Sequence, residues 1–328
     1  MVWLCHREGC TFSDTGVCAR AAEFAEPETE CDDYLSSQPE ELPEPSLPDI
    51  PVFPPWTGNA IGSDFAEQMQ LGNVPARVLI AGKPGSGKTT LLTGQFLELD
   101  RVVHSGLPAQ FAGSYTLYGY DQLCDFAFRW SPGTPGAVPH TSRGQARAPA
   151  WLHLAFRYPG SGATRHILFS DMPGEIFNDW CGDSSVVSGD VLESVHVFWI
   201  VVDASLAAQK VERSAACDLV RRVKSASAGR PVEVILTKYD VLVDLSKPPE
   251  HGEILAPAAQ LISELRQAWG PASELTITPL AAFPHESASN PGWQTLEPLR
   301  RLLAAQATNP VPAERVLRRY VDYVGLTQ

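Results

Sequence analysis

One stretch near residue 80 restricts the possible folds of this chain more than any other. Residues 82–89 read GKPGSGKT and fit the pattern G-x-x-x-x-G-K-[ST] at every fixed position. An apolar run at 78–81 precedes the pattern and predicts a buried strand, and residues 90–92 predict the start of a helix. The pattern requires this order of strand, loop and helix. A chance glycine-rich turn is the alternative, and the later motifs weigh against it.

The glycine-rich loop predicts a phosphate-binding site. Its backbone N–H groups can surround a phosphate, and the N-terminus of the next helix adds the positive end of the helix dipole. We expect Lys88 to reach the β- and γ-phosphates and the Thr89 hydroxyl to bind Mg²⁺. The loop residues expected to contact the nucleotide are Gly82, Gly85, Ser86, Gly87, Lys88, Thr89 and Thr90.

A second motif, Asp171-Met172-Pro173-Gly174, follows the strand predicted at 166–171. A carboxylate at the carboxyl end of a strand can hold Mg²⁺, usually through water, opposite Thr89. Gly174 can bring its N–H close to a γ-phosphate because it has no Cβ. Taken alone, an ordinary turn would be the better interpretation of these four residues.

A third motif, Thr237-Lys238-Tyr239-Asp240, ends the strand predicted at 232–237. A carboxylate at its fourth position can accept both the N1–H and the N2–H₂ of guanine, a pair that adenine lacks. The stem of Lys238 can lie along the base. The pattern is weak alone and strong when it follows Asp171 by one strand–helix–strand unit.

Alternating strands and helices predict the fold of residues 75–328. Near-continuous apolar strands separated by amphipathic helices indicate a mostly parallel sheet covered on both faces, which is a three-layer αβα domain of the α/β class. The predicted strands are 151–158, 166–171, 195–203, 232–237 and 274–280. The predicted helices are 90–99, 121–130, about 206–226, about 256–269, about 294–306 and 313–324.

In this order, the three motifs resemble those of the P-loop GTPases of the translation-factor-related, Ras-like class. The similarity of arrangement covers residues 75–306. The resemblance implies a P-loop NTPase fold, GTP or GDP and Mg²⁺ as ligands, and a second, γ-phosphate-sensing switch at Asp171 and Gly174. It implies that Lys238 and Asp240 read guanine. It further implies that Ala281 or Ala282, after the strand at 274–280, offers an N–H to guanine O6.

Two motif positions depart from that resemblance. Thr237 stands where Asn is commoner, although dynamin-like members also use Thr. Glu175 follows Gly174 where Ras-like enzymes carry a glutamine that orients water, so we expect slow hydrolysis or help from a partner.

The first-switch threonine is the remaining catalytic position that the resemblance requires. Thr141 is the candidate because it precedes the strand at 151–158, and Thr134 is second. Arg143 and Arg147 in the same loop could supply a positive charge to the transition state, although solvated loop arginines are the simpler interpretation. We expect the loops at 131–147 and 172–190 to respond to the γ-phosphate.

The N-terminal part divides into a Cys-rich segment, 1–35, and an acidic, proline-rich linker, 36–74. The segment is too short to bury a core, so a metal would explain how it folds. Four thiolates, or three with a histidine, suit tetrahedral Zn²⁺, but the spacing lacks a C-x₂-C pair. A disordered tail with incidental cysteines and an iron–sulfur cluster stay open. The candidate zinc ligands are Cys5, Cys10, Cys18 and Cys31.

Charge is unevenly spread along the chain. The formal net charge is −13, of which residues 1–60 carry −10, from 12 acidic residues and 2 arginines. An acidic tail does not suit nucleic acid or an anionic membrane as a direct partner. No apolar run reaches 18 residues and the N-terminus does not read as a secretory signal, so we expect a cytoplasmic protein.

The order of Cys-rich segment, linker and GTPase motifs resembles the bacterial double-GTPase families. That resemblance implies a second GTPase or an effector as protein partner, in a conflict or defence system. The leading hypothesis is a guanine-nucleotide switch that hydrolyses GTP slowly. A P-loop ATPase, in which residues 237–240 match by coincidence, and a non-hydrolysing, nucleotide-bound scaffold are the alternatives.

Overall fold

The computed structural model of the 328-residue chain describes most of its C-terminal three quarters. The chain divides into two compact units, Met1–Val52 and Phe53–Gln328. In the first unit, the described residues are Cys31 and Asp33. In the second they are 60–62, Ala66, Met69, 75–101, 106–128, 150–245, 253–270, 274–283 and 292–306. All of the elements below belong to the second unit.

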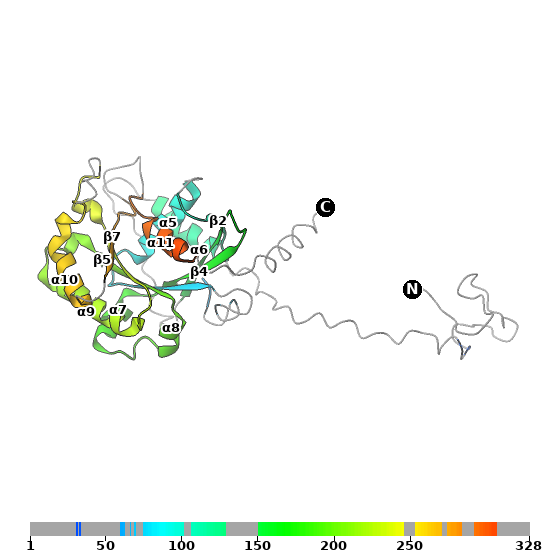
Figure 1. Ribbon diagram of the computed structural model, residues 1–328, viewed down its shortest axis with the longest axis horizontal. Helices are drawn as coiled ribbons and strands as arrows, with labels where there is room; N and C mark the ends of the chain where they lie inside the picture. The colour runs from blue at the N-terminus through cyan, green and yellow to red at the C-terminus, as the bar shows by residue number, and fades with distance from the viewer. Residues whose placement is uncertain are drawn as a thin grey trace. The chain divides into compact units, whose positions relative to one another are not determined.

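A single sheet lies at the centre of the second unit (Figure 1). Among the described residues it has seven strands in the order β2-β3-β4-β1-β5-β6-β7. β3 is antiparallel to both of its neighbours, and the pairs β4–β1, β1–β5, β5–β6 and β6–β7 are parallel. The strands are β1 (Ala76–Ala81), β2 (Gln110–Gly113), β3 (Ala150–Arg157), β4 (Thr164–Asp171), β5 (Val197–Asp203), β6 (Val232–Thr237) and β7 (Thr276–Pro279).

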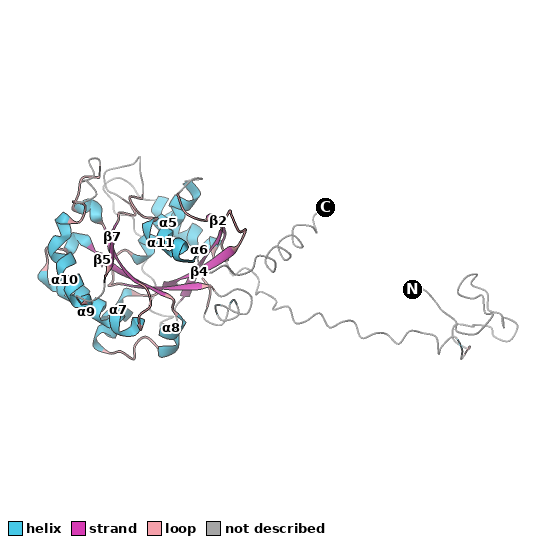
Figure 2. Cartoon of the chain, viewed as in Figure 1, coloured by secondary structure: helices cyan, strands magenta, loops and turns pink. Residues whose placement is uncertain are grey.

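Helices cover both faces of this sheet, which confirms the three-layer α/β prediction (Figure 2). One face packs against α5 (Lys88–Arg101), α6 (Leu117–Phe128) and α11 (Glu297–Gln306). The other packs against α7 (Gly174–Gly182), α8 (Gly189–Ser194), α9 (Lys210–Ser227) and α10 (Ala259–Trp269). Three 3₁₀ turns complete the described elements: η3 (Ala204–Leu206), η4 (Tyr239–Val241) and η5 (Ala256–Ala258).

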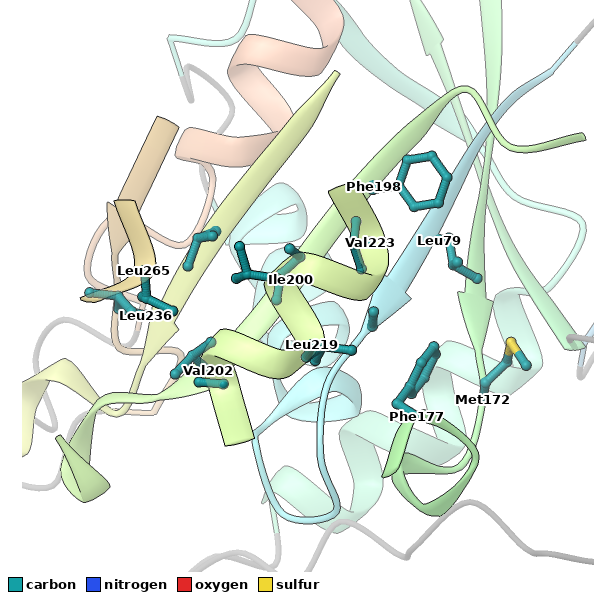
Figure 3. Packing of buried hydrophobic residues seen from close by; sticks show 14 of the residues in the cluster. Leu79, Met172, Phe177, Phe198, Ile200, Val202, Leu219, Val223, Leu236 and Leu265 are labelled. Atoms are coloured by element: carbon teal, nitrogen blue, oxygen red, sulfur yellow. The ribbon is translucent and has the colours of Figure 1, made fainter. Parts of the chain in front are cut away.

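Alternation along the strands divides the buried side chains between two cores. In β1, Leu79 belongs to the core under α9, whereas Val78 and Ile80 belong to the core under α5. Figure 3 shows Leu219 and Val223 of α9 lying over the face of the sheet that carries Leu79. Complete burial of one such side chain stabilises the fold by about 1.5–3 kcal/mol, so both faces hold the sheet rigidly. A rigid sheet fixes the positions of its strand ends, where the three motifs lie.

Part of the predicted linker contributes to the core. Ile61 is fully buried and exchanges two backbone hydrogen bonds with Trp151, with N–O distances of 2.8 and 2.9 Å. Ala66 and Met69 are buried in the same cluster. The division between the two compact units falls at residue 52, whereas the composition of the sequence placed the end of the linker at residue 74.

Several elements differ from the sequence-based expectation. The stretch 172–190, expected as a loop, contains α7 and the start of α8, because Phe177 and Trp180 are one helical turn apart and both are buried. β2 was not expected, since it is a four-residue edge strand that is largely exposed. α6 begins at Leu117 rather than 121, and α9 begins at Lys210 rather than 206.

Other expectations fall outside the described residues: the loop at 131–147 and the helix at 313–324. Within the described part of the chain, no helix is long and apolar enough to cross a membrane.

Candidate nucleotide-binding site

The glycine-rich loop connects β1 to α5, which begins at Lys88. Gly85 and Gly87 have φ angles of 73° and 91°. Side-chain-bearing residues rarely adopt this left-handed region, so the loop needs glycine at both positions. The turn ends at the N-terminus of α5, where unpaired N–H groups favour an anion.

Lys88 lies folded over this loop. Its Nζ donates hydrogen bonds to the carbonyl oxygens of Gly82, at 2.9 Å, and Lys83, at 3.2 Å. The side chain is only 9% exposed, and Nζ lies 5.9 Å from the centre of the Phe177 ring of α7. The ammonium group is therefore held inside the curve of the loop, where a β- or γ-phosphate would lie.

Gly174 packs directly against the backbone of the loop. A Cβ at residue 174 would lie 2.2 Å from Pro84 N and 2.5 Å from the carbonyl carbon of Lys83. Such distances do not occur between real atoms, so only glycine fits here without a shift of backbone. Because Gly174 is also the first residue of α7, the start of this helix and the phosphate loop are in contact.

The loop is equally closed on its other side. A Cβ at Gly82 would lie 2.6 Å from the Ser86 Oγ and 2.7 Å from the Val201 carbonyl oxygen of β5. Lys83 points away from the loop, since its Nζ pairs with Glu212 Oε2 in the first turn of α9 at 2.7 Å. The loop is thus bound to β5, α7 and α9 at once.

Of the two residues predicted to hold Mg²⁺, one ends β4 and the other lies in the helix that follows the neighbouring strand β1. Thr89 lies in the first turn of α5, and Asp171 is the last residue of β4, the parallel neighbour of β1. The Ile80 N–H donates to Ser170 Oγ at 2.8 Å, which ties these strand ends together. A hydroxyl and a carboxylate are hard oxygen ligands that fit Mg²⁺ together with water and phosphate oxygens. Among the described residues, no group of three or more His, Cys, Asp or Glu side chains could hold a metal by itself.

Thr237 joins the third motif to the phosphate loop. It is the last residue of β6 and is 4% exposed. Its hydroxyl donates to the Ser86 carbonyl oxygen at 2.6 Å and lies 3.2 Å from the carbonyl oxygen of Val202. Threonine in place of the commoner asparagine therefore has a structural reason here: its hydroxyl bridges β5, β6 and the loop.

Tyr239 holds the rest of that motif in place. It is fully buried, its N–H donates to the Leu280 carbonyl oxygen at 3.2 Å, and its Oη donates to the Ile254 carbonyl oxygen at 2.7 Å. Burial raises the pKa of Tyr239 to about 12, so the phenol stays neutral and keeps donating. Its neighbours Lys238 and Asp240 lie on either side of this fixed residue.

The loop after β7 carries the two alanines predicted to contact guanine O6. The Ala281 N–H already donates to the Trp293 carbonyl oxygen at 3.0 Å, in an isolated bridge between these residues. Ala282 is 9% exposed and follows directly. The geometry thus favours Ala282 over Ala281 as the donor to a base.

Glu175 is the second residue of α7 and is partly buried. A carboxylate in the first turn of a helix interacts favourably with the helix dipole. This interaction gives Glu175 a structural role that a glutamine would fill less well.

Some predicted site residues cannot be placed. Thr134, Thr141, Arg143 and Arg147 lie outside the described residues, as do Cys5, Cys10 and Cys18. Cys31 is described and is 4% exposed. The first-switch and zinc assignments therefore stay predictions, and metal analysis of the chain with and without residues 1–35 would test the second.

Asp203 is a site residue that the sequence motifs do not include. It ends β5, and its Oδ2 lies 2.6 Å from Lys238 Nζ. Its position in the sequence could have identified it, because it is a carboxylate at the carboxyl end of a predicted parallel strand. Beside it, a cavity of about 300 Å³ opens between the phosphate loop, η3 and α9.

Comparison with known proteins identifies the motif-bearing region. A family model described as Double-GTPase 2 matches residues 76–303. No curated protein matches the sequence.

Three solved structures are weakly similar to this chain. The GTPase-like domain of S. cerevisiae Ski7, bound to GDP and inorganic phosphate, is 13% identical with a TM-score of 0.42, over 76% of this chain and 53% of that one. Bacterial selenocysteine-specific elongation factor EF-Sec is 13% identical with a TM-score of 0.32, over 63% and 25%. The signal recognition particle receptor SRb-GTP/SRX complex from Chaetomium thermophilum is 17% identical with a TM-score of 0.36, over 70% and 98%.

The chain spans about half of the length of the Ski7 structure and a quarter of that of EF-Sec.

Proposed function

Because the chain belongs to the Double-GTPase 2 family, we propose that it is a magnesium-dependent switch that hydrolyses GTP slowly and acts on a protein partner. One observation carries this proposal: three motifs far apart in sequence meet at one edge of the sheet. Gly174 touches the backbone of the phosphate loop, and Thr237 donates to the same loop at Ser86. Loss of the γ-phosphate would therefore act directly on the position of α7.

The division of labour follows from the geometry. Lys88 and the N-terminus of α5 would neutralise the phosphates, and Thr89 with Asp171 would hold Mg²⁺, which supplies charge neutralisation between the β- and γ-phosphates. Asp240 would accept from guanine N1–H and N2–H₂, while Ala282 would donate to O6.

Slow hydrolysis follows from Glu175. A carboxylate beside the γ-phosphate adds negative charge where negative charge already develops, and it lacks the amide N–H₂ that helps to orient water. Thr141 and Arg143 or Arg147 of the preceding loop remain candidates for completing the site. A non-hydrolysing scaffold is the second candidate function, and Glu175 is the observation that favours it.

The proposed partner is a second GTPase or an effector, in a bacterial conflict or defence system, and the proposed compartment is the cytoplasm. Contact between α7 and the phosphate loop supports a switch, because a helix that senses the γ-phosphate can change the surface it presents. The acidic N-terminal segment gives no support for nucleic acid or membrane as the direct partner.

Asp240→Asn tests the guanine assignment. An amide exchanges an acceptor for a donor, so the variant should lose about a hundredfold in GDP affinity and gain affinity for xanthosine diphosphate. Asp244→Asn, an exposed change in the same loop, is the matched control and should alter neither affinity. Full GDP affinity in Asp240→Asn would contradict the assignment, and equal binding of ATP and GTP analogues by the natural chain would favour an ATPase.

Single-turnover hydrolysis tests the enzyme assignment. Lys88→Ala should abolish hydrolysis, and Glu175→Gln should raise the rate several-fold, since an amide orients water without adding charge. Absence of any hydrolysis that depends on Lys88 would favour the scaffold.

A further inference from the structure

Asp203 and Lys238 form an ion pair across the ends of two neighbouring strands. Lys238 Nζ lies 2.6 Å from Asp203 Oδ2. In the parallel register of β5 and β6, Asp203 is opposite Thr237, so Lys238 is the first residue beyond the paired strands. The contact thus joins the carboxyl end of β5 to the side chain proposed to lie along the base.

Asp203 is itself fixed. Its side chain is only 10% exposed, and its second oxygen, Oδ1, accepts from the Ser205 N–H at 2.9 Å and from the Ser205 hydroxyl at 2.5 Å. Both carboxylate oxygens are therefore used, one by the turn η3 and the other by Lys238. These contacts therefore hold the carboxylate of Asp203 in one orientation.

Lys238 is the more exposed member of the pair. Its side chain is 46% exposed, and its backbone has φ 54° and ψ 36°, a left-handed conformation that is uncommon for a residue with a side chain. Such backbone conformations concentrate at functional sites, where the surrounding structure enforces them. The backbone of Lys238 is therefore defined by Tyr239 and the strand end, whereas four rotatable bonds separate it from the ammonium group.

We propose that Asp203 is a positioning residue for the nucleotide base. By holding the ammonium group, it keeps the stem of Lys238 in one orientation and supplies a preformed apolar surface against which the base packs. Without it, the stem would lose rotamer freedom only when the nucleotide binds, which weakens binding. This inference rests on the proposed function, because it assigns to Lys238 the role of a base contact.

An ordinary surface ion pair would have no such effect, and the chain offers one for comparison. Arg221 and Asp218 on α9 are also 2.6 Å apart, but their side chains are 59% and 55% exposed. Exposed pairs of this kind contribute little, because water solvates both partners. Asp203 differs because its side chain is only 10% exposed and its second oxygen is hydrogen-bonded to Ser205.

The dissociation rate of methylanthraniloyl-GDP from the full chain tests the proposal. Asp203→Asn keeps the size of the side chain and should raise the dissociation rate about tenfold. Lys238→Met keeps the apolar stem and should raise it similarly. The double variant should dissociate no faster than Lys238→Met alone, because both changes remove one interaction. Asp218→Asn should leave the rate unchanged.

A second ligand separates positioning from general loosening of the fold. Pyrophosphate makes the phosphate contacts but has no base. Its inhibition constant in competition with methylanthraniloyl-GDP should therefore be equal in the natural chain and in Asp203→Asn. The inhibition constant of GDP should rise in Asp203→Asn. An unchanged dissociation rate in Asp203→Asn, an undiminished effect of Asp203→Asn in the Lys238→Met background, or equal weakening of pyrophosphate and GDP would each overturn the proposal.

If Asp203→Asn does not fold, Ser205→Ala replaces it, because this change loosens Asp203 without removing its charge. It should raise the dissociation rate about two- to threefold, and only when Lys238 is present. No change in that variant would also overturn the proposal. Failure of the proposed function is recognised separately, since the natural chain would then bind guanine and adenine nucleotides equally well.

Discussion

The phosphate end and the base end of the site acquire their shapes by different means. At the phosphate end, backbones touch: Gly82 and Gly174 sit where an added Cβ would lie within 2.6 Å and 2.2 Å of other atoms. At the base end, side chains hold one another, as Asp203 holds Lys238. Backbone contact tolerates no added atom, whereas polar partners can be removed one at a time. Substitutions should therefore be severe at the first end and graded at the second.

The largest effect is expected for Gly174→Ala. The new methyl group would meet the backbone of residues 83 and 84, so α7 or the phosphate loop must move. We expect GTP affinity to fall about a hundredfold, or about 2.8 kcal/mol. Titration with methylanthraniloyl-GTP measures this.

Gly189→Ala is the control, because no atom lies within 4 Å of a Cβ at the start of α8. It should bind GTP normally. If Gly174→Ala bound GTP as tightly as Gly189→Ala, the backbone contact at the phosphate end would not be needed for nucleotide binding.

A smaller effect is expected for Thr237→Val, which sits between the two ends. It removes the hydroxyl that donates to Ser86, and we expect the free energy of unfolding to fall by about 1–3 kcal/mol. GTP affinity should fall about tenfold, because the loop loses one of its supports.

The control for that variant is Thr278→Val, a buried strand threonine whose hydroxyl donates to Glu233. It should cost similar stability in chemical denaturation and leave GTP affinity unchanged. Equal loss of affinity in both variants would mean that the effect comes from the core and not from the loop.

The smallest effect on nucleotide binding is expected when a pair of histidines on β3 and β4, outside the two ends of the site, is protonated. The Tyr115 N–H donates to His153 Nδ1 at 2.9 Å, so His153 Nε2 carries the proton and donates to His166 Nδ1 at 2.8 Å. Burial lowers the pKa of His166 to about 4, and it lowers the pKa of His153 as well.

Both histidines bind protons less readily when folded, so each stabilises the fold fully above the ordinary histidine pKa of about 6.5. The stabilisation from His166 is lost as the pH falls toward 4. The shift at His166 alone corresponds to about 2 kcal/mol lost at pH 5, or roughly 5 °C in Tm. Scanning calorimetry of the natural chain and of His166→Gln measures this, and the variant should depend less on pH. An equal pH dependence in both would assign it to other groups. The ratio of GDP to pyrophosphate affinity should not change.

The phosphate end was predictable from sequence because its shape depends on local backbone geometry. The turn spans eight residues and needs glycine at positions 85 and 87, and both glycines lie within the sequence motif itself. The parallel strands were predictable for a similar reason, since apolar runs such as that at 197–203 report burial on both faces.

The base end was predictable only in part. Asp203 and Lys238 are 35 residues apart, and their contact depends on how β5 and β6 pair. The carbonyl oxygen of Trp293, which takes the N–H of Ala281, comes from a segment with no motif. Edge strand β2 is short and largely exposed, so its sequence lacks the apolar pattern by which a buried strand is predicted. Contacts made by packing leave little trace in the local sequence.

The most direct test of the account is the affinity of the purified full chain for GDP and for ADP, measured side by side in Mg²⁺ by titration calorimetry. A base end that reads guanine predicts that GDP binds at least about a hundredfold more tightly than ADP, because adenine cannot satisfy Asp240. Equal affinities would contradict it, and would leave the phosphate loop as a site for any nucleotide.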